Sequence, residues 1–239
     1  MDINIQKPIA LSKKNIKATW LSNVDNYYIE NKTIVINLGN SSAIIAAKPD
    51  KELHPMCSTI LKEVTLINGD SLLLIEVVNQ INIGGLVLEE GWFQLNDLVN
   101  TFPKEIPLWK GPQFDLGIVK FDPYFVTGLS KIEDPERVRS YQVKVNLWFA
   151  TALTNCGIHN HHMTPEFLEV HTQINGAGRM QKFHANDLES LYQDVYLAKG
   201  ETHIPFASTN ENSEFYYPWH QYFSDTDCIW VANEFHIIN

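Results

Sequence analysis

The amino-acid sequence predicts an all-β protein, and three observations carry this prediction. Short runs of β-branched and apolar residues recur through the N-terminal half, with Gly-Asn and Asn-Gly turns between them. Residues 140–147 alternate at first between two kinds of side chain, as a strand with one buried face does. His159 and His161 are two positions apart, which places both rings on one face if the segment is extended. The 239 residues suffice for one large β domain or two small ones.

The N-terminal half contains the first series of expected strands. Residues 39–40 form a turn between the first two, and Asn68-Gly69-Asp70 is a strong signal for a hairpin between the next two. The half has one histidine, His54, so a metal site here would lack ligands and we expect a structural role. The expected strands cover residues 33–38, 42–47, 63–67, 71–77 and 81–88.

The segment 96–139 is the expected connection between two domains. Five prolines and three glycines fall within it, which breaks regular structure repeatedly. The segment is also rich in Ile, Phe, Trp and Val, so we expect it to pack on both halves rather than to form a free linker. Residues 132–139 are a candidate for a short helix. We therefore divide the chain into domains at 1–110 and 111–239.

The C-terminal half contains a second series of expected strands. In the first of them Tyr141, Val143 and Val145 share one face. Pro165 interrupts the series, because proline cannot donate to a strand ladder. The expected strands cover residues 140–153, the segment with His159 and His161, and residues 167–174, 203–206, 216–223 and 228–234.

Residues 155–180 are the part of the chain best suited to chemistry, since they hold four of the nine histidines and two glutamates. On a strand, His159 and His161 reach a single ion, and His162 then faces away from it. Several imidazoles and one carboxylate are typical ligands of a divalent metal of borderline softness.

This pattern resembles the cupin superfamily. Its first motif is two histidines one residue apart, then a glutamate and a glycine; its second is a glycine, a proline and a histidine on the next strand. The first motif is matched by His159, His161, Glu169 and Gly176, and the second by Gly200, Pro205 and His220. The gap before Glu169 is longer than usual and the loop before His220 is extended, so the match is incomplete.

The resemblance implies a double-stranded β-helix, also called the cupin jelly roll. Residues 63–68 and 88–95 loosely repeat the strand-and-turn plan without ligands, so the chain resembles a bicupin with two barrels. Its domain 1–110 would be a degenerate barrel and its domain 111–239 the metal-binding one. The run 167–178 also resembles metal-dependent bicupin sugar dehydratases. The implied cofactor is one divalent metal (Fe, Mn, Zn or Ni), bound by His159, His161, Glu169 and His220.

Two glutamates compete for the carboxylate position. Glu166 is at the commoner distance from His161, whereas Glu169 shares a strand face with polar side chains, among them His171. A pocket face should carry the polar set, so we favour Glu169. The residues expected to move protons are His171 and Glu166; a histidine that is merely hydrogen-bonded across the sheet is the alternative for His171.

Composition excludes several classes of partner. The formal charge of −10 and the pI near 5.3 argue against a nucleic-acid partner. No apolar segment approaches the length of a membrane span, and the N-terminus lacks the apolar core of a secretory signal. The three cysteines are far apart and without CxxC spacing, as in reduced cytosolic proteins. We expect a cytoplasmic protein with a small-molecule partner, and leave a homodimer open.

The leading functional hypothesis is an enzyme in which the metal acts as a Lewis acid on a small oxygen-rich metabolite, possibly a sugar derivative, in an isomerase, dehydratase or lyase reaction. The alternatives are an iron-dependent cupin dioxygenase and a ligand-binding cupin without catalysis. Ligand identity alone does not separate these hypotheses.

Overall fold

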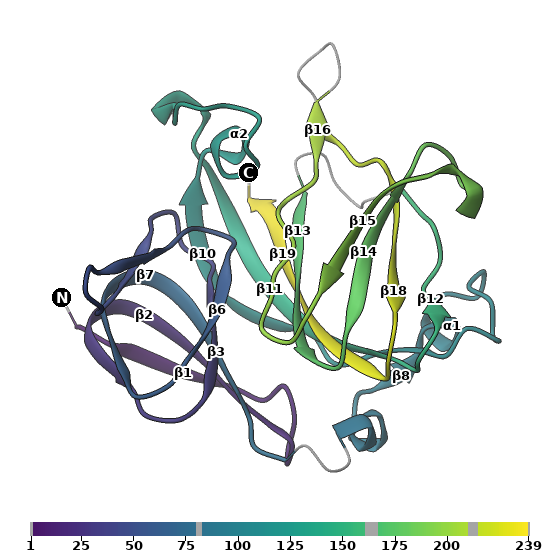
Figure 1. Ribbon diagram of the computed structural model, residues 1–239, viewed down its shortest axis with the longest axis horizontal. Helices are drawn as coiled ribbons and strands as arrows, with labels where there is room; N and C mark the ends of the chain where they lie inside the picture. Colours follow the sequence, from purple (N-terminus) through teal and green to yellow (C-terminus); the bar gives the residue numbers. More distant parts are fainter. Residues whose placement is uncertain (1, 80–82, 161–166, 210–214, 239) are drawn as a thin grey trace.

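A computed structural model describes residues 2–79, 83–160, 167–209 and 215–238 (Figure 1). The predicted all-β class is confirmed, because antiparallel strands in four sheets make up most of the described chain. The α-helices are single turns. None of the helices in these residues has the length and apolar character to cross a membrane.

The N-terminal strands form one seven-stranded sheet, which wraps around a core of its own (Figure 1). Leu21, Val35, Leu66 and Leu72 are fully buried in this core. The order along the sheet is β1-β2-β7-β3-β6, with β4 paired to both β5 and β7. The strands are β1 (Ile5–Ile9), β2 (Ile16–Ile29), β3 (Thr33–Asn37), β4 (Ala43–Ile45), β5 (Lys51–Leu53), β6 (Ser58–Leu61) and β7 (Val64–Val77).

The hairpin predicted at Asn68-Gly69-Asp70 is wrong, because β7 runs through these residues without a turn. Gly69 lies opposite Val24 of β2, and a Cβ at this glycine would lie 3.3 Å from the Cβ of Ala43. The glycine therefore permits close packing of neighbouring strands instead of a reversal. Asn23 and Asn26 on β2 have positive φ, yet the register of β2 with β7 is the same on both sides of them.

The connection between the halves consists of short helices and strands, as its many prolines indicate. The strand predicted at 81–88 is wrong for the residues that the structure describes, because Ile83–Leu88 form a 3₁₀ helix. Of the helix expected at 132–139, one 3₁₀ turn forms, Pro135–Arg137. The other elements are β8 (Phe93–Gln94), α1 (Leu95–Leu98), β9 (Leu108–Lys110), β10 (Phe114–Phe121) and α2 (Pro123–Val126).

The side chain of Asp122 links several parts of this connection through hydrogen bonds. Its fully buried carboxylate caps α2 by accepting from the backbone N–H of Tyr124, and it also accepts from the backbone N–H of Asp134 and from the guanidinium of Arg137. Burial alone would raise the pKa of Asp122, but these hydrogen bonds and the guanidinium charge outweigh burial and lower it.

The C-terminal strands form the predicted jelly roll. One sheet contains β11, β19 and β13, and Thr202 extends it by a single bridge to Thr172; the other has the order β12-β18-β14-β15. Following the chain, this is the strand order of two interlocked Greek keys. The elements are β11 (Arg139–Ala150), β12 (Thr154–Asn155), β13 (Leu168–Asn175), β14 (Gly178–Phe183), a 3₁₀ turn (Leu188–Ser190), β15 (Leu191–Leu197), β16 (Ser208–Thr209), β17 (Phe215–Tyr216), β18 (Trp219–Ser224) and β19 (Cys228–Ile238). The strand expected at 203–206 does not form; the nearest pairing is the single bridge between Thr202 and Thr172.

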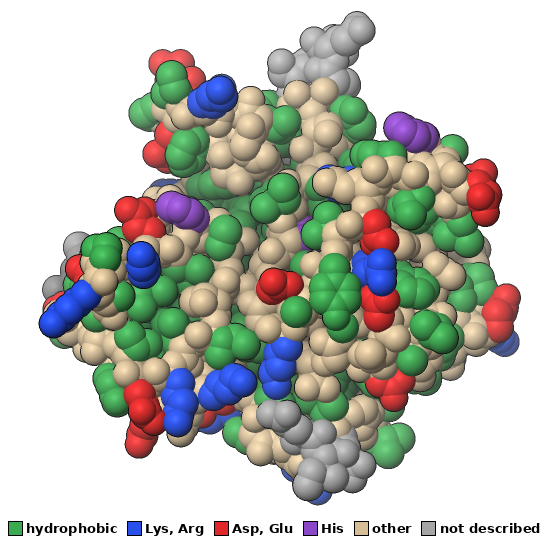
Figure 2. Space-filling model, viewed as in Figure 1, with side chains coloured by type: hydrophobic (Ala, Val, Ile, Leu, Met, Phe, Trp, Pro, Cys, Tyr) green, Lys and Arg blue, Asp and Glu red, His purple; other side chains and the backbone are tan. Residues whose placement is uncertain are grey.

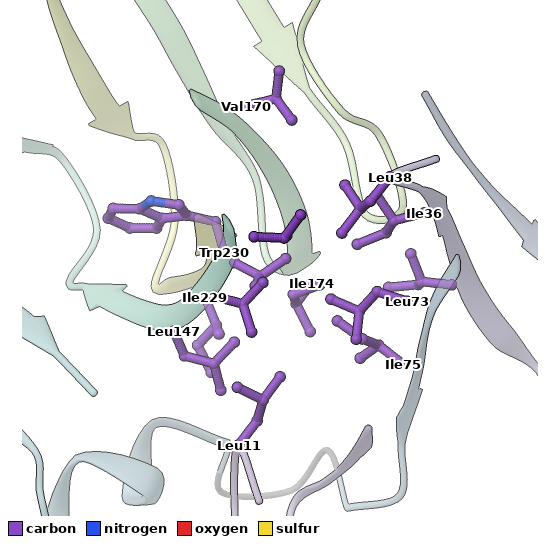
Figure 3. Close-up of a cluster of buried hydrophobic side chains, with 14 of the residues drawn as sticks. Leu11, Ile36, Leu38, Leu73, Ile75, Leu147, Val170, Ile174, Ile229 and Trp230 are labelled. Atoms are coloured by element: carbon purple, nitrogen blue, oxygen red, sulfur yellow. The ribbon is translucent and has the colours of Figure 1, made fainter. Parts of the chain in front are cut away.

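The outer face of the β13-β19-β11 sheet packs against the N-terminal half (Figure 3). Its side chains meet those of β3 and β7, so both halves share one large core. The residues at this contact are Leu147, Val170, Ile174 and Ile229 from the jelly roll and Ile36, Leu38, Leu73 and Ile75 from the N-terminal half. The strands β8 and β9 join the jelly-roll sheet through β11. The division at residue 110 and the degenerate first barrel stay predictions.

Candidate functional site

A cavity of about 570 Å³ lies inside the jelly roll. Side chains from both sheets line it, and the connection around residues 95–108 covers one side. We call it the central cavity. Four predicted site residues are among its lining: His159, Glu169, His171 and His220. The remaining two, His161 and Glu166, lie outside the described residues.

His159 and His220 lie side by side although they are distant in sequence. They form a two-way backbone bridge, with both N···O distances 2.9 Å, and their ring centroids are 4.3 Å apart. Nδ1 of His159 donates to the carbonyl of Gly157 at 3.0 Å, and Nδ1 of His220 donates to the carbonyl of Pro218 at 2.8 Å. With the proton on Nδ1, the neutral ring has its lone pair on Nε2. Backbone carbonyls commonly fix metal-binding histidines in this way.

Glu169 and His171 project from β13 onto the inner face of the β13-β19-β11 sheet, opposite the sheet that contains His220. Their exposed side-chain fractions are 17% and 13%, and Nε2 of His171 is 3.2 Å from Oε1 of Glu169. The predicted alternation is confirmed, because Leu168 and Val170 are buried in the outer core. His171 thus belongs to the cavity and has a carboxylate partner.

His203 supports His171 from behind. Its Nε2 accepts from the backbone N–H of His171 at 2.9 Å, and its Nδ1 donates to the carbonyl of Ile204 at 2.9 Å. These bonds require the neutral ring. Burial, and then the neighbouring His171, lower the pKa of His203 to about 3. His203 is therefore a structural histidine with two hydrogen-bond partners.

Aromatic side chains form one wall of the central cavity, and the sequence analysis did not predict their grouping. Trp230 stacks on Tyr222, with centroids 4.0 Å apart and planes at 14°, and on Trp148 at 6.2 Å and 6°. Trp148 and Trp230 are register partners in β11 and β19, so their rings share the inner face. The alternation along residues 140–147 places Trp148 on the face opposite the core, which is the one available signal.

A second carboxylate on the inner face was also missed. Glu234 pairs in register with Glu169 and is 8% exposed. It accepts hydrogen bonds from Asn146, Gln113 and His236, each at 2.8 Å. The ring of His236 is thereby held beside Glu234. These donors satisfy the buried carboxylate within the fold.

Three other side chains of the jelly roll lie outside the predicted ligand set. Arg179 forms ion pairs with Asp225 and Asp194 at 2.8 and 2.9 Å. Tyr217 is buried and donates to the carbonyl of Phe167 at 2.9 Å. Cys156 lines the central cavity as a buried thiol, and burial raises its pKa well above the ordinary value.

Within residues 2–79, 83–160, 167–209 and 215–238, no three His, Cys, Asp or Glu side chains approach closely enough to form a metal site by themselves. The described part of the chain contributes two oriented imidazoles and one carboxylate in a shared cavity. The donor types suit a divalent metal, and the fourth predicted ligand, His161, lies in the segment outside the description.

Strand order and cavity define the class of this protein: an all-β jelly roll with a histidine-containing cavity between its sheets. No protein-family model and no curated protein matches the chain.

Solved structures with similarity include cupin proteins. A Bacillus subtilis oxalate decarboxylase studied for its Mn(II) centres is 10% identical, with 94% of this chain and 70% of the decarboxylase covered and a TM-score of 0.29. A cupin 2 conserved barrel domain protein from Leptotrichia buccalis is 10% identical, with 98% and 88% covered and a TM-score of 0.29. These superpositions are loose, so the jelly-roll assignment rests on the strand order.

Proposed function

We propose that the central cavity is the active site of a metal-dependent enzyme of the cupin type. The observation that supports it is the pair His159 and His220, whose Nδ1 atoms are both bonded to backbone carbonyls. A structural histidine needs no such matched orientation, whereas two ligands of one ion do. The proposed ligands are His159, His161, Glu169 and His220, with Glu166 as the alternative carboxylate.

A divalent metal, when bound, supplies Lewis acidity toward a substrate carbonyl or hydroxyl oxygen. The chain itself orients the substrate and handles the proton. Nε2 of His171 lies 3.2 Å from Oε1 of Glu169; with the proton on Nε2, Nδ1 is the atom that accepts a proton. This Nδ1 is buried and has no hydrogen-bond partner in the described part of the chain. We assign the proton transfer to His171 at Nδ1, with Glu166 as the second candidate. His203 positions His171 through the backbone.

The favoured reaction class is an isomerase, dehydratase or lyase reaction on an oxygen-bearing small molecule. An iron-dependent dioxygenase is the second candidate, and the aromatic wall beside the histidines favours it, since an apolar cavity also admits dioxygen. Anaerobic loading with Fe(II), followed by measurement of oxygen uptake with candidate substrates, distinguishes the two classes.

Metal analysis of purified protein tests the centre itself. We expect stoichiometric metal in the wild type, and a loss of at least about tenfold in affinity in His220→Ala. The matched control is His184→Ala, which removes an exposed histidine outside the central cavity and leaves metal content unchanged. Thermal unfolding of each variant checks that it is folded. Undiminished metal in folded His220→Ala contradicts the proposal, and ligand binding without turnover for any metal supports a non-catalytic cupin instead.

A further inference from the structure

The lining of the central cavity is mostly apolar and aromatic away from the histidines. Besides the Tyr222–Trp230–Trp148 stack, it includes Met180 from β14 and, from the connection, Phe102 and Ile106. The volume of about 570 Å³ is that of a typical small-molecule site. Trp230 and Tyr222 are almost fully buried and support the wall from behind, whereas the rings of Trp148 and Phe102 are partly exposed. Exposed aromatic rings favour a planar guest, because offset stacking gives large contact between flat faces.

No Lys or Arg is among the described lining residues, so no side chain there neutralises an anionic group on a substrate away from the proposed metal. Basic groups on neighbouring strand positions are already engaged. The guanidinium of Arg179 lies between two aspartates, and the amino groups of Lys110 and Lys182 each lie 5.1 Å from a ring centroid, over Trp148 and Phe206. Glu169 in the lining and the net charge of −10 disfavour anions further.

The polar side chains of the cavity are gathered at one end of it, where His159, Glu169, His171 and His220 line the wall. Nε2 of His159 and of His220 carries the lone pair of each neutral ring, because Nδ1 of each donates to a backbone carbonyl. Polar groups at one end and apolar side chains elsewhere favour a guest with one oxygen-bearing end.

We propose that the central cavity takes an uncharged planar aromatic molecule with oxygen substituents at one end. Its ring packs along the partly exposed rings of Trp148 and Phe102, and its oxygen atoms face the histidines. This substrate class rests on the proposed function for the role of the oxygen atoms. It differs from the sugar-derived substrate expected from the sequence, because a polyol needs many hydrogen-bonding side chains along the wall.

Calorimetric titration with three probes tests the preference: 2,3-dihydroxynaphthalene, 2-naphthoate and glucose. The first is neutral, aromatic and oxygen-bearing, the second adds a negative charge, and the third is oxygen-rich without a ring face. We expect the dihydroxy probe to bind at least about tenfold more tightly than either comparator. Equal or tighter binding of naphthoate or glucose, or no binding of the dihydroxy probe, overturns the inference.

Repeating the titrations after chelation separates this inference from the metal proposal. If the chain binds no metal but prefers the dihydroxy probe, the proposed function fails and the cavity preference stands. If metal is stoichiometric but the preference is absent, only the substrate class fails.

Two variants on the connection test the wall without disturbing the strands. Phe102 and Ile106 are partly buried and line the central cavity. Phe102→Ala should weaken binding of the dihydroxy probe roughly tenfold at unchanged metal content, whereas the control Phe125→Ala, on α2, should not. Ile106→Lys introduces a cation and should shift the preference toward naphthoate. Unchanged binding in both folded wall variants refutes the proposed location of the guest.

Discussion

The substitution Gly178→Ala tests whether close packing of Gly178 on Tyr222 holds the aromatic wall in place. Gly178 begins β14 and has no positive φ, so alanine suits its backbone. An ideal Cβ at this position, however, lies 2.6 Å from two ring carbons of Tyr222. The ring has little freedom to move away, because it stacks on Trp230 at 4.0 Å and its hydroxyl bonds Gln173.

Overpacking of this kind costs about 1–3 kcal/mol. In a protein of this size each kcal/mol corresponds to about 2–4 °C in Tm, so we expect a decrease of roughly 2–12 °C. Thermal and urea unfolding measure the loss. Binding of 2,3-dihydroxynaphthalene should weaken as well, because the displaced ring is part of the cavity wall.

Gly85→Ala is the matched control, since a Cβ there meets no atom within 4 Å. Its free energy of unfolding should stay within about 0.5 kcal/mol of the wild type. Tyr222→Phe removes the hydroxyl, so its combination with Gly178→Ala should be less destabilising than the sum of the single effects. If Gly178→Ala is as stable as Gly85→Ala and binds the probe normally, the packing argument is refuted.

Three further substitutions test electrostatic features by urea unfolding. Asp122→Asn should lower the free energy of unfolding by about 3 kcal/mol at pH 7, because it leaves Arg137 without its buried partner. The folded-state pKa of Asp122 is lowered, so this contribution is present above about pH 4 and is lost as the pH falls further. A deficit that persists undiminished at pH 3 contradicts the assignment. His203→Gln should abolish a pH dependence of the wild-type free energy of unfolding. The unfolded imidazole takes up a proton near pH 6.5 but the folded one near pH 3, so the wild type should lose about 2 kcal/mol between pH 7 and pH 5. An equal loss in the variant refutes the neutral His203 ring that supports His171. Arg179→Met should lower the free energy of unfolding by less than about 1 kcal/mol, because its ion pairs are partly exposed. Metal content should stay unchanged, and a loss of metal would show that Arg179 contributes to the site.

The sequence by itself determined features that depend on local periodicity. The alternation along residues 140–147 and 167–174 correctly indicated β11 and β13, and it placed Glu169 and His171 on one face. Such patterns are readable because consecutive strand side chains point to opposite faces. The same reasoning failed at Asn68-Gly69-Asp70, since a turn dipeptide also fits where two strands approach closely, and nearby side chains decide between the two.

Only the tertiary structure decided which faces meet. The register of β18 brings His220 beside His159, and the pairing of β11 with β19 stacks Trp148 on Trp230. Each partner is far away in the chain, so no local pattern contains the contact. A strand's period tells which side chains share a face, but strand order and register, which depend on packing of the whole core, determine what that face touches. For this reason the sequence indicated a histidine site, whereas its aromatic wall emerged from the fold.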